Sequence, residues 1–319
     1  MKLQNASSAL GRSTPVVEGC SNLSQQDLAN QRKGQWFMVG GGLLLGTLGI
    51  FIEEAGQSAL TAVWFRCCFG LLALTLWFAV SNRWSELRLS RRDAALAIAG
   101  GLFMVLNWVL FFEAVPRTSM SVATLVVHVQ PFLIMVIGTV WLGERVSHRQ
   151  WGGAMVALVG LGLATGALDQ VLGSKNAGSM DLQGIALALG AALAYALAPL
   201  LLRRARGASS LVMAWWQCVA GTVALAWWPL TQGWPAPGPA WAWLVGMGVV
   251  HTGLAYVLLY AGVSRLPAGR MAILQFVYPA SAIVFDVVVY GRSLSGIQLT
   301  GGALLLASLL VAAREKART

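Results

Sequence analysis

The stretch HVQPFLIMVIGTVWLGERVS, residues 128–147, decides the fold of this chain. It is an apolar run that contains a histidine, a glutamine and a proline, and it stops at Gly143-Glu144-Arg145. A second stretch, FVYPASAIVFDVVVYGRSLS at residues 276–295, has the same outline. A helix needs about 20 apolar residues to cross a bilayer. The two stretches therefore predict membrane helices that belong to an internal repeat.

The composition points to the bilayer as the solvent of the whole chain. Its 319 residues are 57% hydrophobic and 11% charged, with a mean hydropathy of +0.68, whereas soluble domains carry about 25% charged residues. The net charge of +10 does not indicate nucleic acid, because the basic residues lie in short clusters between apolar runs. The four cysteines form no metal or haem motif, and no cofactor is expected.

We expect an all-α integral membrane protein with ten transmembrane helices. The polar segment 1–34 is predicted to be a disordered cytoplasmic tail, 168–182 an outer linker, and 314–319 a second cytoplasmic tail. The predicted spans are 35–52, 59–81, 93–113, 119–142, 150–167, 183–202, 211–230, 240–262, 268–290 and 296–313.

The distribution of Lys and Arg supports this count. With the N-terminus in the cytoplasm, 18 of the 22 basic residues fall in cytoplasmic segments. The outer side keeps Arg117, Lys175 and Arg292, and Arg66 lies inside a span. An excess of Lys and Arg in cytoplasmic loops is the usual rule for membrane proteins. The expected location is the cytoplasmic (inner) membrane, with many passes and both termini inside.

An internal repeat relates the two halves. At a shift of 148 positions Pro131 falls on Pro279, and Gly143 falls on Gly291. Ser147 likewise falls on Ser295. Each copy would contain five of the ten predicted helices. Because five is an odd number, the second copy enters the membrane in the opposite orientation. Inverted repeats of this kind occur in many secondary transporters, where they flank a substrate site near the membrane midplane; a scaffold made of duplicated helices is the alternative.

The same residues carry a family resemblance over most of 36–313. The sequences LVVHVQPFLIMVIGTVWLGERVSHRQWGGAMVALVGLGL and LQFVYPASAIVFDVVVYGRSLSGIQLTGGALLLASLLV resemble the two EamA repeats of the drug/metabolite transporter superfamily. The resemblance implies repeats at 35–167 and 183–313 and a transporter of small molecules, which in this superfamily usually moves them outward. The second copy departs from the pattern, with Gly291-Arg292 where Gly-Glu is usual.

Polar side chains within the spans are the candidates for a substrate site, because polar groups in hydrocarbon tend to face a partner or a water-filled cavity. Hydrogen bonding between packed helices is the alternative for these residues. Trp108 lies deep enough to stack on a ligand, or it packs between helices. The cavity candidates are His128, Gln130, His251, Gln275, Tyr278 and Trp108.

Two further roles are predicted from residue type and position. Pro131 and Pro279 remove a helix hydrogen bond each, so they are candidate hinges, although prolines are common in membrane helices. Arg66, Glu113 and Asp286 crowd the outer side and form a candidate outer gate. The alternative is that Arg66 extends toward the outer interface.

The sequence favours a secondary transporter that exports a small neutral or zwitterionic, amino-acid-like metabolite by alternating access. No phosphate-binding loop is present, so gradients would supply the energy. Proton coupling through His128 or His251 is a hypothesis, because histidine titrates near neutral pH. An integral membrane enzyme is the rival, but no catalytic constellation supports it; a receptor or scaffold is a third alternative. The oligomeric state is left open.

Overall fold

The computed structural model describes residues 15–173, 181–205, 207–291 and 293–314. Within those ranges every regular element is helical, and η1 and η2 are 3₁₀-helices while η4 is a π-helix. The elements are α1 (Pro15–Gly46), α2 (Leu48–Ala55), α3 (Ala59–Val80), η1 (Trp84–Leu87), α4 (Arg91–Ala114), η2 (Val115–Arg117), α5 (Met120–Val127), α6 (Gln130–Leu142), α7 (His148–Ala164), α8 (Ala167–Gly173), α9 (Leu182–Arg204), α10 (Ser210–Ala224), α11 (Trp227–Gln232), α12 (Ala240–Gly246), η4 (Met247–Leu254), α13 (Ala255–Val263), α14 (Ala268–Leu274), α15 (Val277–Tyr290) and α16 (Gly296–Arg314).

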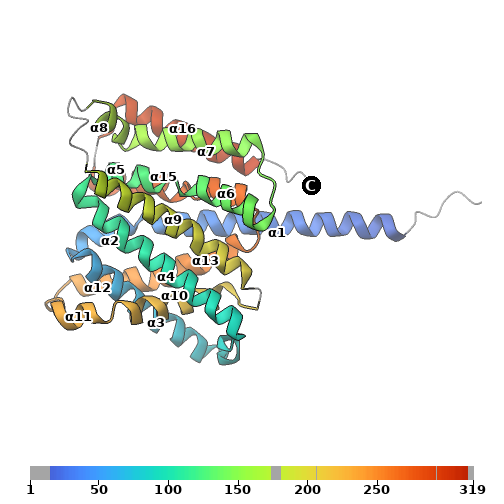
Figure 1. Cartoon of the computed structure of the whole chain (residues 1–319), viewed down its shortest axis with the longest axis horizontal. Coiled ribbons are helices and arrows are strands. Elements are labelled where there is room, and N and C mark those ends of the chain that lie inside the picture. Colours follow the sequence, from blue (N-terminus) through green and yellow to red (C-terminus); the bar gives the residue numbers. More distant parts are fainter. Residues whose placement is uncertain (1–14, 174–180, 206, 292, 315–319) are drawn as a thin grey trace, which may run out of the picture.

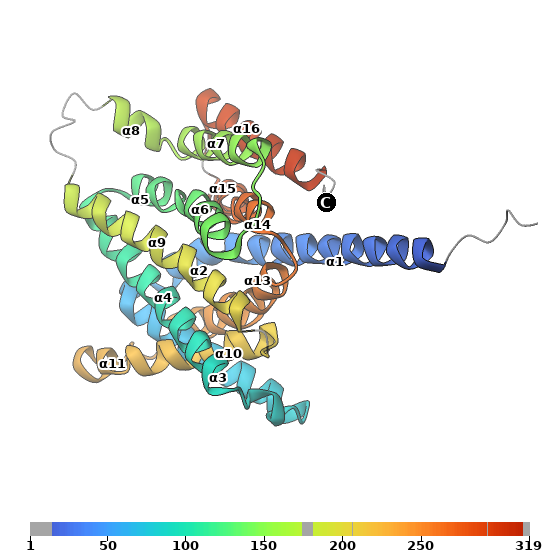
Figure 2. The same ribbon diagram turned by 45° about the vertical axis from the view of Figure 1, so that its right-hand side comes forward.

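The helices lie roughly side by side and form one bundle (Figures 1 and 2). One end carries α2, α8 and α11, and we call it the α2 end. The other end carries the start of α1 and the last turns of α6, α9 and α16, and we call it the α1 end (Figure 1). The chain therefore begins and finishes its described part at the same end of the bundle.

Eight helical segments of the described residues are long and apolar enough to cross a membrane. The predicted spans 150–167 and 296–313 correspond to α7 and α16, which are not among them. α7 has 17 residues, which at 1.5 Å per residue gives about 25 Å, a little less than the ~30 Å hydrocarbon layer. The apolar part of α16 is likewise short, Gly296–Val311.

The surface of the bundle carries many large apolar side chains. Leu72, Val140 and Leu310 are 60%, 80% and 58% exposed. A water-soluble protein rarely exposes so much contiguous apolar surface, whereas a lipid-facing surface requires it. The exposed side chains and the long apolar helices together identify a multi-pass membrane protein.

Residues 15–34 differ from the predicted disordered tail. They continue α1, which runs as one helix from Pro15 to Gly46. Gln and Ala in this segment are good helix formers, and Arg270 donates a hydrogen bond of 3.0 Å to Gln31 Oε1. The other part of the predicted tail, residues 1–14, lies outside the described residues.

The sequence repeat is visible in the turns that follow α6 and α15. Gly143 and Gly291 end these helices with φ of 67° and 63°, a left-handed conformation that favours glycine. Ser147 then caps the helix that follows the first turn, in a reciprocal pair with Gln150. Ser295 and Gln298 form the same pair after the second turn. Equivalent residues therefore make equivalent turns in the two halves.

α7 and α16 pack against each other through glycines, beside the other helices (Figure 2). A Cβ placed on Gly301 would lie 2.6 Å from the carbonyl oxygen of Gly160, so the two backbones meet without side chains between them. Ser308 adds a hydrogen bond of 2.6 Å from its hydroxyl to the carbonyl of Gly153. Close backbone approach through small residues is a common way for membrane helices to associate.

We predict that Gly301→Ala destabilises the protein and that the neighbouring Gly302→Ala does not. The new methyl group at position 301 meets backbone atoms of α7, whereas the one at position 302 has nothing within 4 Å. Overpacking costs about 1–3 kcal/mol, while Gly→Ala in an open helix position gains about 0.5–1 kcal/mol. Thermal unfolding of the detergent-solubilised variants measures the difference. Equal melting temperatures for the two variants would contradict the predicted packing of α7 on α16.

Candidate functional site

A cavity of about 160 Å³ lies inside the bundle. Its walls come from the junction of α1 with α2, from α3, α4 and α9, from α13, and from the two broken helices α5/α6 and α14/α15. Leu48, Ile52 and Met120 extend the lining toward the α2 end. The cavity therefore reaches from the middle of the bundle toward the α2 end.

Two equivalent helix breaks form one side of this cavity. α5 ends at Val127 and α6 begins at Gln130, while α14 ends at Leu274 and α15 begins at Val277. Each proline comes just after a break: Pro131 and Pro279 lie in the first turn of the new helix. Proline is well suited to this place because the first turn does not use its missing N–H.

The prolines leave two backbone carbonyls without their helical partner. In an unbroken helix the N–H of residue 131 would donate to the carbonyl of Val127, and that of residue 279 to the carbonyl of Gln275. Val127 and Gln275 both line the cavity. Irregular backbone inside a membrane is tolerated where it lines a cavity or packs in protein, and both breaks meet that condition.

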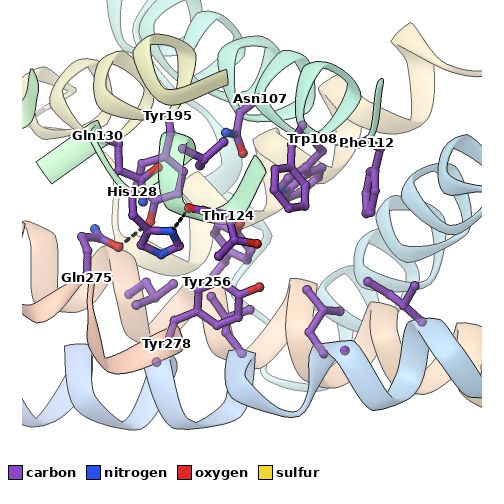
Figure 3. A pocket seen from close by; sticks show the side chains of 18 of the residues that line it. Asn107, Trp108, Phe112, Thr124, His128, Gln130, Tyr195, Tyr256, Gln275 and Tyr278 are labelled. Atoms are coloured by element: carbon purple, nitrogen blue, oxygen red, sulfur yellow. Dashed lines mark hydrogen bonds between the residues drawn. The ribbon is translucent and has the colours of Figure 1, made fainter. Parts of the chain in front are cut away.

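His128 presents an acceptor to this region. Its Nδ1 lies 2.6 Å from the carbonyl oxygen of Thr124, and because a carbonyl only accepts, Nδ1 carries the proton. In the neutral ring Nε2 is then the unprotonated nitrogen, and it is buried without a hydrogen-bond partner. The ring lies against Tyr278, with centroids 6.2 Å apart and planes 28° from parallel. Figure 3 shows both side chains at one end of the cavity.

Two glutamines complete that end of the cavity. Gln275 Oε1 accepts a hydrogen bond of 2.6 Å from the Tyr195 hydroxyl, which links α14/α15 to α9. Gln130 Oε1 is buried and has no partner. His128 and Gln130 therefore offer two unsatisfied acceptors close together in sequence and on one wall (Figure 3).

Arg66 lines the cavity from α3 with 2% of its surface exposed. Its Nε donates to Thr252 Oγ1 at 2.8 Å, its guanidinium lies 4.2 Å from the centroid of the Trp108 ring, and Nη2 has no partner. Among the described residues no carboxylate forms an ion pair with it. A cation–π contact stabilises by about 0.5–2 kcal/mol, less than the several kcal/mol that desolvation of an ion costs. Arg66 is therefore a buried cation whose charge is incompletely compensated.

The structure brings five of the six predicted cavity residues together and leaves out His251. Trp108, His128, Gln130, Gln275 and Tyr278 line the cavity. His251 instead holds the α1/α2 junction: its Nε2 lies 2.9 Å from Thr47 Oγ1, and its ring meets Phe51 edge to face.

The three candidate gate residues do not form one ion-pair cluster in this conformation. Arg66 faces the cavity, whereas Glu113 pairs with the exposed Arg117 at 3.0 Å. Asp286, which is half-buried on α15, forms no ion pair with Arg66 within the described chain. The gate role of these three residues stays a prediction.

Four polar residues of the lining were not predicted: Asn107, Thr124, Tyr195 and Tyr256. Asn107 lies next to Trp108 and donates a hydrogen bond of 2.9 Å to the carbonyl of Ala191. It is a polar residue in an apolar run, and this was a usable sequence signal of the cavity. Three of the chain's five tyrosines line the cavity, at positions 195, 256 and 278. Because tyrosine is rare in this chain, the tyrosines within spans were a second sequence signal of the cavity.

Glu144 closes the α1 end of the bundle. One carboxylate oxygen accepts from Arg203 at 2.5 Å, and the other accepts from the backbone N–H of Ala268 at 2.5 Å. These contacts join the end of α6 to the end of α9 and to the start of α14. Ala268 also lies directly against Gly138 of α6, where a Cβ would collide with it. The cavity lining contains no residue from these last turns.

The bundle thus holds a central cavity with a mostly apolar lining and a few polar groups, and this lining stops short of the Glu144 contacts at the α1 end. The EamA-like transporter family model matches residues 32–166 and again 182–314. The chain belongs to this family of small-molecule transporters.

Relatives and a solved structure agree with this assignment. An uncharacterized transporter of Bacillus subtilis (strain 168), YxxF, is 28% identical over 261 residues, which is 78% of this chain and 79% of that protein. An uncharacterized transporter of Archaeoglobus fulgidus is 27% identical over 89% of this chain and 97% of its own. The pseudopaline exporter CntI of Pseudomonas aeruginosa (strain UCBPP-PA14) is 26% identical over 37% of this chain and 44% of its own. A crystal structure at 22% identity superposes with a TM-score of 0.74, covering 88% of this chain and 96% of that one, and shows the shared fold.

We predict a strong energetic coupling between Glu144 and Arg203. Both side chains are 19% exposed, so water screens the pair poorly, and the coupling should be about 0.5–3 kcal/mol. A double-mutant cycle with Glu144→Gln and Arg203→Gln, followed by thermal unfolding, measures it.

The pair Arg83–Glu86 is the control for this cycle. It has the same bond length of 2.5 Å but is 45% and 32% exposed, and the hydrogen bond from Arg83 lowers the pKa of Glu86. Exposed ion pairs stabilise little, so its coupling should be the smaller one. Equal coupling in the two cycles would contradict a closing role for Glu144.

Proposed function

We propose that this protein is a secondary transporter that exports a small neutral or zwitterionic, amino-acid-like metabolite by alternating access. The observation that carries the proposal is the cavity between the two broken helices. It has polar groups at mid-depth, a mostly apolar and aromatic wall, and repeat-related prolines on one side. Small-molecule sites are typically apolar pockets with a few placed polar groups.

The proposed architecture is ten passes arranged as two inverted five-helix repeats, 35–167 and 183–313. Two observations support it. The turns and caps after α6 and α15 are built from equivalent residues, and the described chain starts and finishes at the same end of the bundle. In this reading α7 and α16 are short spans that cross as a pair, with 168–182 as the linker between the repeats.

The proposed orientation places the α1 end in the cytoplasm of a bacterial-type inner membrane. Arg203 and Arg204 end α9, Arg265 and Arg270 flank the α13–α14 turn, and the loop near η1 is basic as well. All of these lie toward the α1 end, which fits the excess of basic residues on the cytoplasmic side. The cavity then opens outward and the Glu144 contacts close the inner side.

An alternating-access cycle requires that the closed end open in turn. The hinges proposed for this motion are the breaks at Pro131 and Pro279, where each membrane helix consists of two pieces. The gradient that drives transport is proposed to be a proton gradient with His128 as the carrier, since His128 lines the cavity with a free ring nitrogen. His251, bound to Thr47, is the weaker candidate.

The enzyme alternative gains no support from the site. Among the residues that the structure describes, no cluster of three His, Cys, Asp or Glu side chains is placed to hold a metal ion. The cavity lining contains no carboxylate, so paired-acid chemistry has no candidate there.

The function is tested by flux. Metabolites of cells and medium are compared after deletion and overexpression, and the solute that accumulates outside is then assayed in proteoliposomes. We predict that Gln130→Leu lowers its flux at least tenfold, because the variant removes an unsatisfied acceptor from the cavity wall. The control is Ser308→Ala, which removes a buried hydroxyl outside the cavity and should keep the flux. The proposal would be refuted if the wild-type protein in proteoliposomes transported none of the solutes whose levels change when the gene is deleted.

The orientation is tested by two single cysteines in a background without the native four. Ser85 lies in the loop at the α1 end and Gln183 at the start of α9, both exposed. An impermeant thiol reagent applied to intact cells should label Gln183→Cys and should label Ser85→Cys only after permeabilisation. The reverse pattern would contradict the proposed orientation, and labelling of both positions in intact cells would contradict the pass count between them.

A further inference from the structure

We propose that the cavity binds a solute with a carboxylate at one end and a hydrogen-bond donor at the other, and that Arg66 is the carboxylate anchor. This assignment rests on the proposed transport function and specifies the substrate class for the same cavity. The solute class is a small organic aminocarboxylate, which is the zwitterionic case of the proposed function, and hydroxycarboxylates serve as the comparison.

The cavity carries a positive charge that no carboxylate of its lining compensates. Arg66 is the formal cation of the lining, and no Asp or Glu lies among the lining residues. Its Nη2 is buried without a partner, although Nε is held by Thr252 and the ring of Trp108 covers the guanidinium. The side chain is thus fixed in place with donors to spare. A planar guanidinium with free N–H groups matches the geometry of a carboxylate.

The opposite end of the cavity offers hydrogen-bond acceptors. His128 Nε2 and Gln130 Oε1 are both unsatisfied acceptors, and the proton on Nδ1 of His128 is already used by Thr124. Acceptors repel a second carboxylate and bind an N–H or O–H group. Figure 3 shows Trp108, which marks the Arg66 end, well separated from His128 and Gln130.

The rest of the lining is apolar and aromatic. Tyr256 and leucines of α1, α2 and α13 contribute to it, Tyr278 lies at the His128 end, and Phe112 lies beyond Trp108 (Figure 3). Such a lining favours an organic body between the two polar groups over a small inorganic anion, which would leave the aromatic surface unused. The charge, the acceptors and this lining together define a bipolar solute aligned along the cavity.

The test uses purified protein in detergent and a panel of small amino- and hydroxycarboxylates, each paired with its carboxamide. Ligand binding to the folded state raises the melting temperature, and the chain's tryptophans report unfolding. We expect at least one carboxylate to bind wild-type protein at least tenfold more tightly than its amide. Chloride and inorganic phosphate are measured alongside, and equal protection by either would overturn the assignment to an organic solute.

Variants then locate the anchor. Arg66→Gln should reduce the affinity for the carboxylate at least tenfold, Arg66→Lys should recover part of it, and Arg83→Gln, in the loop at the α1 end, should leave it unchanged. Gln130→Leu should weaken an aminocarboxylate more than the matched carboxylate without the amino group. The wild-type comparison of acid and amide needs no variant, so it tests the preference for a carboxylate even if Arg66→Gln does not fold, and Arg66→Lys, which keeps the charge, then tests the anchor.

The outcomes separate this inference from the proposed function. A panel in which no carboxylate binds better than its amide, or unchanged binding by Arg66→Gln, overturns the inference. If a carboxylate binds through Arg66 but shows no flux in proteoliposomes, the site is correct and the transport proposal fails. If a solute is transported with the same affinity by wild type and by Arg66→Gln, transport is correct and the inference fails.

Discussion

The interior of a bilayer offers no hydrogen-bond partners, so a polar group placed there must find one inside the protein or face a water-filled cavity. This protein breaks two of its membrane helices in the middle, at His128–Val129 and Gln275–Phe276. A break of this kind frees backbone groups, and a proline just after it removes a further N–H. The carbonyls left over belong to Val127 and Gln275, and both residues face the cavity. The cavity and the breaks therefore depend on each other.

The rest of the bundle follows from this constraint. Polar side chains gather at the cavity because the remaining surface faces lipid, as the exposed Val140 and Leu72 show. Arg66 is tolerated at depth because Thr252 and Trp108 hold it and because the cavity can supply an anion or water. At the α1 end, Glu144 accepts from the first N–H of α14 and from Arg203 at once, so one carboxylate links three helices there, although Nη1 of Arg203 is buried without a hydrogen-bond partner.

Much of this arrangement was predictable from sequence because it depends on residue types and on their local order along the chain. The apolar runs predicted the helices, the repeat predicted the matching turns at Gly143 and Gly291, and a polar residue inside a span was a sound sign of the cavity at His128, Gln130 and Gln275. The resemblance to EamA repeats is confirmed by the family model on both halves. The prolines were expected to bend long helices, whereas the structure places each at the start of a second helix.

What could not be predicted depends on which way a side chain points. His251 is as polar and as central as His128, yet it turns to Thr47 and away from the cavity. Asn107 and Tyr195 stand out as polar residues within apolar runs, but their sequence positions do not show that the packing of α9 on α4 brings both to one cavity wall. Arg66 was expected in an outer gate with Glu113 and Asp286, or extended toward the outer interface. The structure places it against Trp108 in the cavity lining, and its gate role stays a prediction. The rotation of each helix about its axis decides which of these side chains face the cavity. A single sequence without periodic charges along the helices does not show this rotation.

The central claim is that polar, water-accessible space reaches the helix breaks in the middle of the membrane. The most direct measurement is thiol accessibility in a background without the native cysteines, with one cysteine at a time. Thr124→Cys lies in the cavity wall just before the first break, and Val136→Cys lies on the lipid-facing side of α6, 45% exposed. A charged, water-soluble thiol reagent should modify the first and spare the second, because a thiol in hydrocarbon stays protonated and unreactive. Protection of Thr124→Cys under conditions that label an exposed loop cysteine would contradict the account.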